Sequence, residues 1–587
     1  MTIPTLPQKD DPARQAQRQQ RLARAREDYR YLQVETGVRG EPALPMIDEL
    51  PFAELFSVEY LTRVTKAGLE LVGNRLLVEL QGLLPESPRL RDLDTRRLKA
   101  VTPTTYLGPM EDLAHRLAAL PPLPARSLKQ YDQLSPLLQR LPIVDVFQQD
   151  TVFAHQRTAG PNPLVLQRVD EVPSHLAITE AHFQRALGEG DSLAAARAEG
   201  RLFLADYAVL EGLPPGTTPD GRRKYIRAPM ALFCWREPPA AGLVPVAIQL
   251  GQSRDAPVFT PADGTAWQVA KLFVQVADGN VHETISHLGR THLLVEPFVL
   301  ATARQLDRTH PVAVLLQPHF RFTLGINHAA RRILIAPGGG VDQLLAGTLE
   351  GSLSLASTAR AAPFRDGALP RELAQRGLAD TSVLPDYPYR EDALPLWKAI
   401  QDFVTQYLRL YYAGDADVVG DFELQGWVRE LQSGDGGHVQ GLTASGGIET
   451  VADLEAVLTQ LLFTAGPQHA AVNFTQFPLM GYVPNQPLAA YAPPPADASP
   501  LPHEALLRWL PPLDQAFQQE SLLYLLSSLR LDELGRYRFT DPRAIEAATT
   551  FRRRLKELDA DIDERNRTRA MPYPYLKPSR IPNSINI

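Results

Sequence analysis

The longest helical pattern in the chain runs from residue 267 to residue 304. Apolar residues recur along it every three or four positions, and the first proline in it is Pro297. Two apolar runs at 229–237 and 243–250, separated by Pro238-Pro239, predict instead a β-hairpin. Further helical patterns cover 391–431, 450–480, 503–531 and 541–566. The chain is therefore predicted to be mainly α, with a small antiparallel β element.

The N-terminal part also follows a helical period. Residues 13–35 predict an arginine-rich helix that is capped by Asp11 and starts at Pro12. Two interpretations of this helix stay open, a solvated arm or a basic surface that contacts anionic lipid headgroups at a membrane. Residues 57–83 are helical in pattern as well, and nothing before residue 130 shows the short alternating strands of a β-sandwich.

Composition narrows the class of protein. Hydrophobic residues make up 44% and charged residues 22% of the 587 residues, as in an ordinary soluble globular protein. The net charge of -7 argues against a nucleic-acid-binding protein. Cys234 is the one cysteine and has no partner for an internal disulfide. The start of the chain lacks the apolar run of a secretory signal, and no run is long enough to span a bilayer, so we expect cytoplasmic residence.

A histidine-rich segment lies inside the long helix. His282 and His287 are five residues apart, and on a regular α-helix such positions lie on different faces. Both can reach one metal ion only if the turn between them is widened by a π-bulge. The alternative is a solvated or core pair without a metal. His292, His310 and His319 receive no ligand role, and His292 is expected to be a buried hydrogen-bonding residue.

Two distant segments strengthen the metal hypothesis. His469 and Asn473 are four residues apart, on one face of an ordinary helix, although a hydrogen-bonded core pair would show the same spacing. The chain ends in the apolar sequence Ile-Asn-Ile587, whereas chain ends are usually polar and frayed. A carboxylate buried with this tail must be paired or metal-bound.

In these motifs the sequence resembles the lipoxygenases, the non-haem iron dioxygenases of polyunsaturated fatty acids. The resemblance covers roughly residues 130–587 and rests on motifs in family order: 267–319, 386–389 with Trp397, 469–478 and 581–587. It implies an N-terminal helical arm at 1–40, followed by a lipoxygenase catalytic domain at 41–587 without the N-terminal β-sandwich, as in some bacterial members. It also implies an iron site between two central helices, the first with a π-bulge.

The resemblance further implies a ligand set and a reaction. The ligands are His282, His287, His469, Asn473 and the Ile587 carboxylate, and the ion is iron that cycles between Fe2+ and Fe3+; manganese would suit the same donors. Gln476 would orient Asn473 by hydrogen bonding; alternatively, Gln476 is a simple core amide without a role at the metal site.

The substrates that the resemblance implies are a polyunsaturated fatty acid and O2. A hydrogen atom leaves the bis-allylic carbon of a 1,4-pentadiene, and O2 adds to give a lipid hydroperoxide. A lipid hydroperoxide isomerase and an inactive lipid-binding relative remain as alternatives.

Three positions concern the substrate. Gly325 matches the family position where glycine accompanies R-configured products, because it leaves room for O2; relief of helix packing is the alternative. Ala329 and Leu526 resemble the pair that clamps the pentadiene. Gln486 stands where some plant members have an arginine, so a fatty-acid carboxylate finds no charged partner there. The substrate would then enter with its methyl end first or be an esterified lipid.

Overall fold

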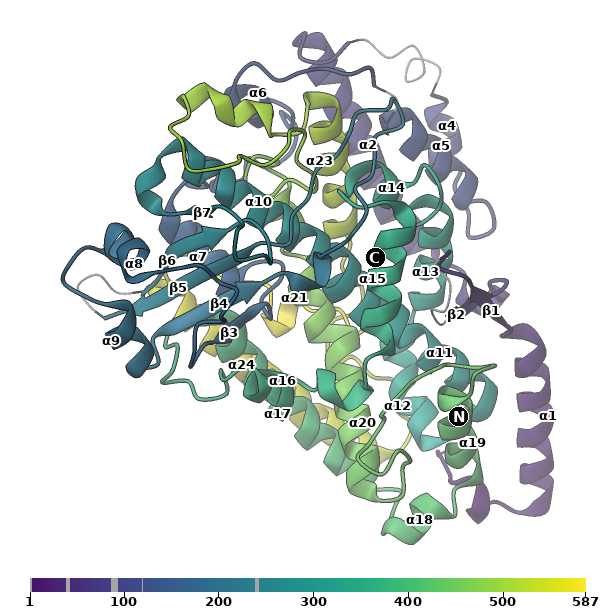
Figure 1. Cartoon of the computed structure of the whole chain (residues 1–587). Helices are drawn as coiled ribbons and strands as arrows, with labels where there is room; N and C mark the ends of the chain where they lie inside the picture. Colours follow the sequence, from purple (N-terminus) through teal and green to yellow (C-terminus); the bar gives the residue numbers. More distant parts are fainter. Residues whose placement is uncertain (1–2, 38–42, 86–92, 119, 238–241) are drawn as a thin grey trace.

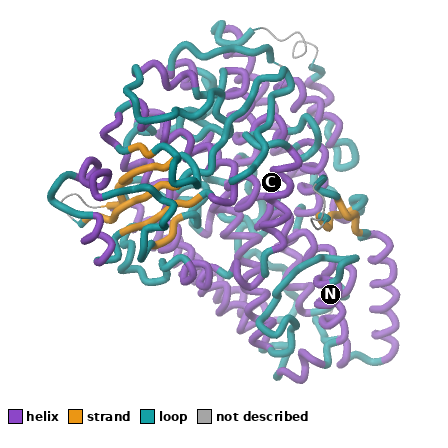
Figure 2. The backbone as a smooth tube through the Cα atoms, in the orientation of Figure 1, coloured by secondary structure: helices purple, strands orange, loops and turns teal. Residues whose placement is uncertain are grey.

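A continuous buried helix runs through the centre of the fold. It consists of α10 (Thr265–Val281), the π-helix η6 (His282–His292) and α11 (Leu293–Gln305), so the predicted long helix is confirmed. The computed structural model describes residues 3–37, 43–85, 93–118, 120–237 and 242–587. Figures 1 and 2 show that helices make up most of these residues, that the larger sheet lies on the left and that the short pair β1 (Tyr31–Val34) and β2 (Leu44–Ile47) lies on the right. The mainly α class is therefore confirmed.

Other helices enclose this central helix. Helix α15 (Leu349–Ala361) packs along η6, and α19 (Phe422–Gln432) packs on α11. The second predicted ligand region consists of α20 (Val451–Phe463), the short π-helix η8 (Thr464–Gln468) and α21 (His469–Asn473), and α21 lies against η6. Further helices of the body are α7 (Asp150–Ala159), α8 (Glu180–Leu187), α12 (Pro311–Phe320), α13 (Thr323–Ile333), α16 (Leu369–Gln375), α17 (Pro388–Leu408), α22 (Gln476–Met480), α23 (Leu513–Ser527) and α24 (Pro542–Thr568).

The main sheet has five antiparallel strands in the order of the sequence. These are β3 (Leu166–Arg168), β4 (Leu202–Asp206), β5 (Met230–Arg236), β6 (Gly242–Gln249) and β7 (Val258–Phe259). Strands β5 and β6 pair as the predicted hairpin, while its turn lies outside the described residues. Helices α7 and α8 pack on β6. The sheet therefore forms a flank of the helical body, as Figure 2 shows.

The N-terminal helix α1 (Pro12–Asp28) begins as predicted, with the Asp11 side chain accepting from Arg14 N. It ends seven residues before the predicted position 35, because Tyr31–Val34 forms strand β1, which pairs with β2 (Leu44–Ile47). Arginines of α1 bond to the body: Arg18 pairs with Asp10 and Glu423, and Arg21 pairs with Asp307. The predicted arm boundary at residue 40 lies outside the described residues.

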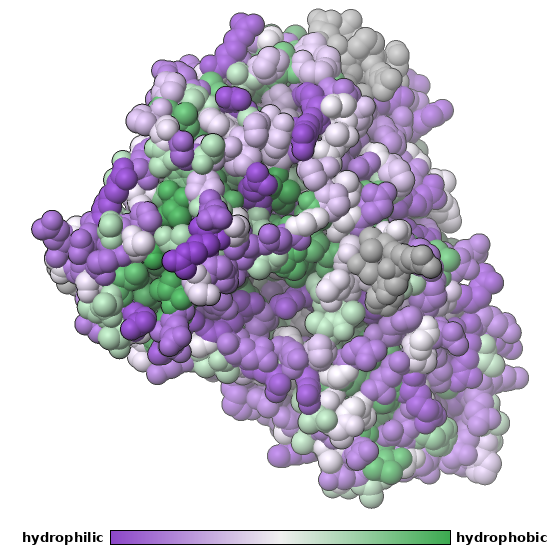
Figure 3. All heavy atoms as spheres, in the orientation of Figure 1, coloured by the Kyte–Doolittle hydropathy of each residue, from purple (hydrophilic) through white to green (hydrophobic). Residues whose placement is uncertain are grey.

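Helices α2 (Val58–Leu80) and α5 (Leu107–Ala118) complete the N-terminal part and pack against α23. In the part of the chain that the structure describes, no helix combines the length and the apolar character that a membrane crossing requires. Figure 3 shows a mostly hydrophilic face on which hydrophobic residues gather over the sheet and near the middle.

Candidate metal centre

Helix η6 has the widened turns that the spacing of its histidines required. It is a π-helix over all eleven residues from His282 to His292, a rare element that is concentrated at functional sites. His282, His287 and His292 follow one another at intervals of five residues. The pair His282 and His287 therefore has the same spacing as the pair His287 and His292. Contacts with other helices decide which of the two pairs directs its nitrogen atoms at one point.

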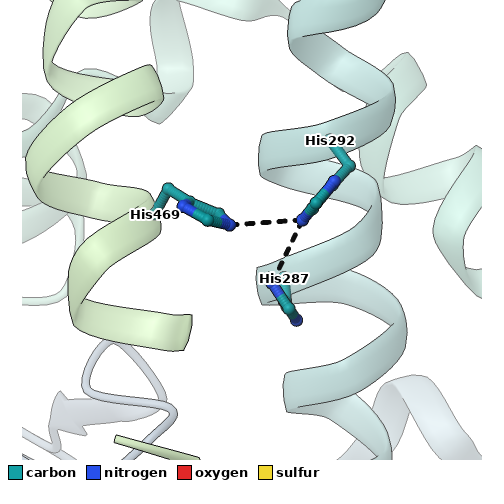
Figure 4. A group of neighbouring side chains, drawn as sticks. All are labelled: His287, His292 and His469. Carbon is teal, nitrogen blue, oxygen red and sulfur yellow. Dashed lines mark hydrogen bonds between the residues drawn. The ribbon is translucent and has the colours of Figure 1, made fainter. Parts of the chain in front are cut away.

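The structure brings His287, His292 and His469 together. The Nε2 atom of His292 lies 3.2 Å from Nε2 of His287 and 3.2 Å from Nε2 of His469 (Figure 4). Two nitrogen atoms bound at right angles to one ion, each about 2.1 Å from it, lie about 3.0 Å apart. The three buried imidazoles, whose ligand atoms all lie within 4.8 Å of one another, are thus close enough to hold one metal ion.

The structure places His282 outside this cluster. Its Nε2 lies 2.8 Å from the carbonyl oxygen of Val472, and its Nδ1 lies 3.5 Å from the Glu283 carboxylate. His282 therefore connects η6 to α21 and does not belong to the group of three imidazoles whose nitrogen atoms come together. The sequence predicted the pair His282 and His287 as ligands, whereas the structure brings His287 together with His292. The reason is that α21 approaches η6 with His469 beside His292, which the equal spacings along η6 could not reveal.

A buried hydrogen-bond chain orients His292. Asn327 Oδ1 lies 2.8 Å from Nδ1 of His292, while Asn327 Nδ2 donates to the Glu296 carboxylate (2.8 Å) and to His292 O (3.0 Å). Glu296 also accepts from Ile47 N at 2.6 Å. Because both protons of the Asn327 amide are used elsewhere, its oxygen must accept from Nδ1–H of His292. The lone pair of His292 is then on Nε2, the atom that faces the other two imidazoles.

Burial keeps the triad in the neutral form that binds metal. It lowers the pKa of His292 to about 3 and lowers the pKa of His469 well below its usual range. The pKa of His287 is also lowered by burial, against the opposing effect of the Glu283 carboxylate 3.7 Å away. Neutral imidazoles present lone pairs at neutral pH, so no proton has to leave before a cation binds.

Asn473 and Gln476 lie beside the triad on α21 and α22. Gln476 Nε2 donates to Asn473 Oδ1 at 3.1 Å and lies 3.4 Å from Nδ1 of His287. The Asn473 amide nitrogen donates to the carbonyl oxygen of Leu526 at 2.9 Å. The Asn473 amide is thus held with its oxygen on the side of Gln476 and His287.

The C-terminal tail is buried and fixed by its own polar side chains. All residues from 581 to 587 are buried. The main chain of Ile587 raises the pKa of His469, against the larger lowering by burial, which locates the chain end at the triad. Three side chains of the tail donate to neighbouring main-chain carbonyl groups: Asn583 Nδ2 to Arg536 O at 2.9 Å, Ser584 Oγ to Arg321 O at 2.8 Å, and Asn586 Nδ2 to Leu531 O at 2.9 Å.

The predicted substrate positions lie in one apolar cluster with the chain end. Ala329 and Leu526 are half-buried members of the cluster that contains Ile587. A Cβ atom at Gly325 would lie 3.0 Å from the ring of Phe56, so this glycine allows the ring to approach α13 closely. Gln486 is elsewhere: it is buried and donates to the Asp278 carboxylate at 2.9 Å.

Four residues of this region were not predicted from the sequence. One is His292, for which we expected only a structural role. The others are the aromatic cover, which we define as Phe56, Tyr60 and Tyr106. Phe56 stacks on Tyr60 with ring centroids 4.1 Å apart and meets Tyr106 edge-on at 4.7 Å. The pair Phe56 and Tyr60, four residues apart where a helix begins, was the only signal of this cover in the sequence.

Comparisons with known proteins identify relatives over most of the chain. The family model described as Lipoxygenase matches residues 142–573. A linoleate 9/13-lipoxygenase from Pseudomonas aeruginosa is 36% identical, over the whole of this chain and 93% of that protein. A human hydroperoxide isomerase, ALOXE3, is 36% identical over 75% of this chain and 62% of its own. The crystal structure of coral 8R-lipoxygenase superposes with a TM-score of 0.84 at 30% identity, covering all of this chain and 83% of that one. The chain therefore belongs to the lipoxygenase family of dioxygenases.

Proposed function

We propose that this enzyme adds O2 to the 1,4-pentadiene of a free polyunsaturated fatty acid and releases a lipid hydroperoxide. The observation that carries the proposal is the convergence of three neutral imidazole nitrogens beside the buried end of the chain. Linoleate is the first substrate to test, because a relative that matches the whole chain is named for it.

His287, His292 and His469 would hold a non-haem iron together with the amide oxygen of Asn473 and the Ile587 carboxylate. Bound iron supplies the one-electron chemistry that removes a hydrogen atom from the bis-allylic carbon. The chain itself supplies orientation: Asn327 fixes the tautomer of His292, and Gln476 holds Asn473. The apolar cluster around Ala329 and Leu526 would receive the pentadiene and exclude water from it.

The test measures metal content and product on the same purified protein. Elemental mass spectrometry should find about one iron per chain, and linoleate should give the ultraviolet absorbance of a conjugated diene. If the protein contains manganese in place of iron and gives the same product, the proposed ion changes and the proposed ligand set stays the same. Iron without dienes, together with consumption of an added lipid hydroperoxide, would replace the dioxygenase by the isomerase activity for which ALOXE3 is named. Absence of both reactions would contradict the proposal.

We also propose R-configured products. The support is Gly325, and one relative of known structure is named an 8R-lipoxygenase. In Gly325→Ala, the added methyl group would press on the Phe56 ring at 3.0 Å and occupy space beside the pentadiene. The product should shift from R towards S on chiral chromatography. An S product from the unchanged enzyme, or an unchanged R product from the variant, would contradict this assignment.

A further inference from the structure

A cavity lies beside helix η6 and shares no residue with the apolar cluster of Ala329 and Leu526. It holds about 490 Å³, within the range of about 300–1,000 Å³ that is typical of small-molecule sites. Its walls come from η6, α15, α16, α20 and the segment 162–167. The residues that line it do not include Gly325, Ala329 or Leu526. It is therefore separate from the place proposed for the pentadiene.

The interior of this cavity combines an apolar wall with one buried cation. The apolar wall includes Val281, Ile285, Phe364 and Phe463. The cation is Arg360, whose residue surface is 1% exposed. Its Nη1 atom donates to Gly437 O at 3.1 Å, while its Nε and Nη2 atoms have no hydrogen-bond partner in the described structure. A buried guanidinium with two unused donors is costly unless a ligand completes it.

The carboxylates around this cavity are already engaged. Glu372 pairs with Arg290 at 2.7 Å and with Arg376 at 3.1 Å. Asp366 pairs with Arg371 at 2.9 Å, outside the lining. Asp206 accepts from Ala208 N and from Gln252 Nε2, both at 2.9 Å. None of these three carboxylates, which line the cavity, forms an ion pair with Arg360 in the described structure.

Two further arginines, Arg290 and Arg376, lie at the entrance of the cavity. The side chains of Arg290 and Arg376 are 39% and 24% exposed, and Nε of Arg376 also lacks a hydrogen-bond partner in the described structure. An anion would meet positive charge at the mouth and a free guanidinium inside. A guanidinium recognises a carboxylate or phosphate with two parallel hydrogen bonds.

We propose that this cavity binds an amphipathic anion with a single aliphatic chain, its head on Arg360 and its chain against Ile285 and Phe463. A fatty-acid carboxylate and a monoalkyl phosphate share this chemistry. The cavity is also lined by Ser286 and Gln468, the direct neighbours of His287 and His469. A ligand here would therefore lie beside the metal centre, in a cavity separate from the place proposed for the pentadiene.

The test is calorimetric titration of the full-length protein with dodecanoate, which has no pentadiene and cannot turn over. Binding should weaken about tenfold or more in Arg360→Met, because a charged hydrogen-bond partner is lost. Arg360→Lys should recover part of the affinity, and dodecanol should bind about tenfold more weakly than dodecanoate. Arg409→Met, which removes an exposed arginine at the end of α17, should bind like the wild type.

Two variants separate this cavity from the substrate side. Val209→Trp fills the mouth from a residue that is 48% exposed, so it should fold normally and lose dodecanoate binding even if Arg360→Met does not fold. Leu526→Trp fills the other pocket and should keep this binding event. Tighter binding of dodecyl phosphate than of dodecanoate would support the site and identify a phosphate head as its ligand. Unchanged affinity in both Arg360→Met and Val209→Trp, or loss of all binding in Leu526→Trp, would overturn the proposal. None of these outcomes depends on dioxygenase activity.

Discussion

The C-terminal tail and the aromatic cover contact the same apolar cluster, but they are held in different ways. The tail is fixed by side-chain hydrogen bonds to main-chain carbonyl groups of neighbouring segments, donated by Asn583, Ser584 and Asn586. The cover is held mainly by ring contacts, among them those of Phe56 and Tyr60 with Phe322 at 5.5 and 5.0 Å. Directional bonds fix one position, whereas apolar contacts tolerate repacking. The tail should therefore determine metal binding, and the cover should determine access to the pocket.

The largest effect is expected at the chain end. Adding one glycine after Ile587 moves the terminal carboxylate away from the triad, and the buried tail has no room for the extra residue. Iron content and turnover should fall by about a hundredfold or more, beyond the loss that follows from changing a supporting group. The control Ile587→Val keeps the carboxylate and should keep the iron. An extended protein with full iron and full turnover would remove the carboxylate from the ligand set.

The next effect concerns the support of His292. Asn327→Ala removes the acceptor for Nδ1–H of His292, so iron affinity should fall by about 10- to 100-fold, as measured by competition with a chelator. The matched control is Asn74→Ala, a buried asparagine that bonds to Leu134 O far from the centre. It should lower stability and leave iron affinity unchanged. Equal iron affinity in the two variants would show that Asn327 has no role in metal binding.

A change in the aromatic cover should affect the substrate and not the metal. Phe56→Ala empties the space beside Gly325, so the KM for linoleate should fall while iron content stays the same. The free energy of unfolding should drop by about 3 kcal/mol, because a buried ring is lost. Phe52→Ala, four residues earlier and 85% exposed, should change neither quantity. Loss of iron in Phe56→Ala would mean that the cover supports the metal centre directly.

The smallest expected effect is a pH dependence of stability at Glu296. This residue of α11 accepts a hydrogen bond from Ile47 N at the end of β2. Burial raises the pKa of Glu296 to about 7 in the folded protein. The folded state then binds this proton more tightly than the unfolded state, so the contribution of Glu296 to stability is lost as pH rises from its unfolded pKa through about 7. Glu296→Gln cannot titrate. The Tm of the variant relative to the wild type should therefore rise between pH 5 and pH 8, whereas Glu59→Gln, which is exposed, should show no such trend. A parallel pH profile for Glu296→Gln and the wild type would contradict the assignment.

Much of the fold followed from local patterns. The period of apolar residues predicted the central helix and α24, and the proline pair between two apolar runs predicted the β5–β6 hairpin. The need to widen a turn between histidines predicted the π-helix. Each of these signals lies within one segment of the chain, where spacing alone carries the information.

The rest depended on contacts between distant segments. The choice of His292 over His282 depends on where α21 meets η6, and both histidines stand five residues from His287. The cover depends on Phe56 and Tyr60 meeting Tyr106 and Phe322, which are far away in the sequence. Likewise, the unused donors of Arg360 appear only once the neighbouring carboxylates are seen to be paired. The periodicity of apolar residues in the sequence does not encode these contacts between distant segments.

The most direct test of the central claim is the iron content of His292→Ala and His282→Ala, prepared side by side and checked for folding by circular dichroism. The triad of His287, His292 and His469 predicts that His292→Ala loses its iron and that His282→Ala keeps it. Retention of iron by His292→Ala together with its loss from His282→Ala would contradict the triad.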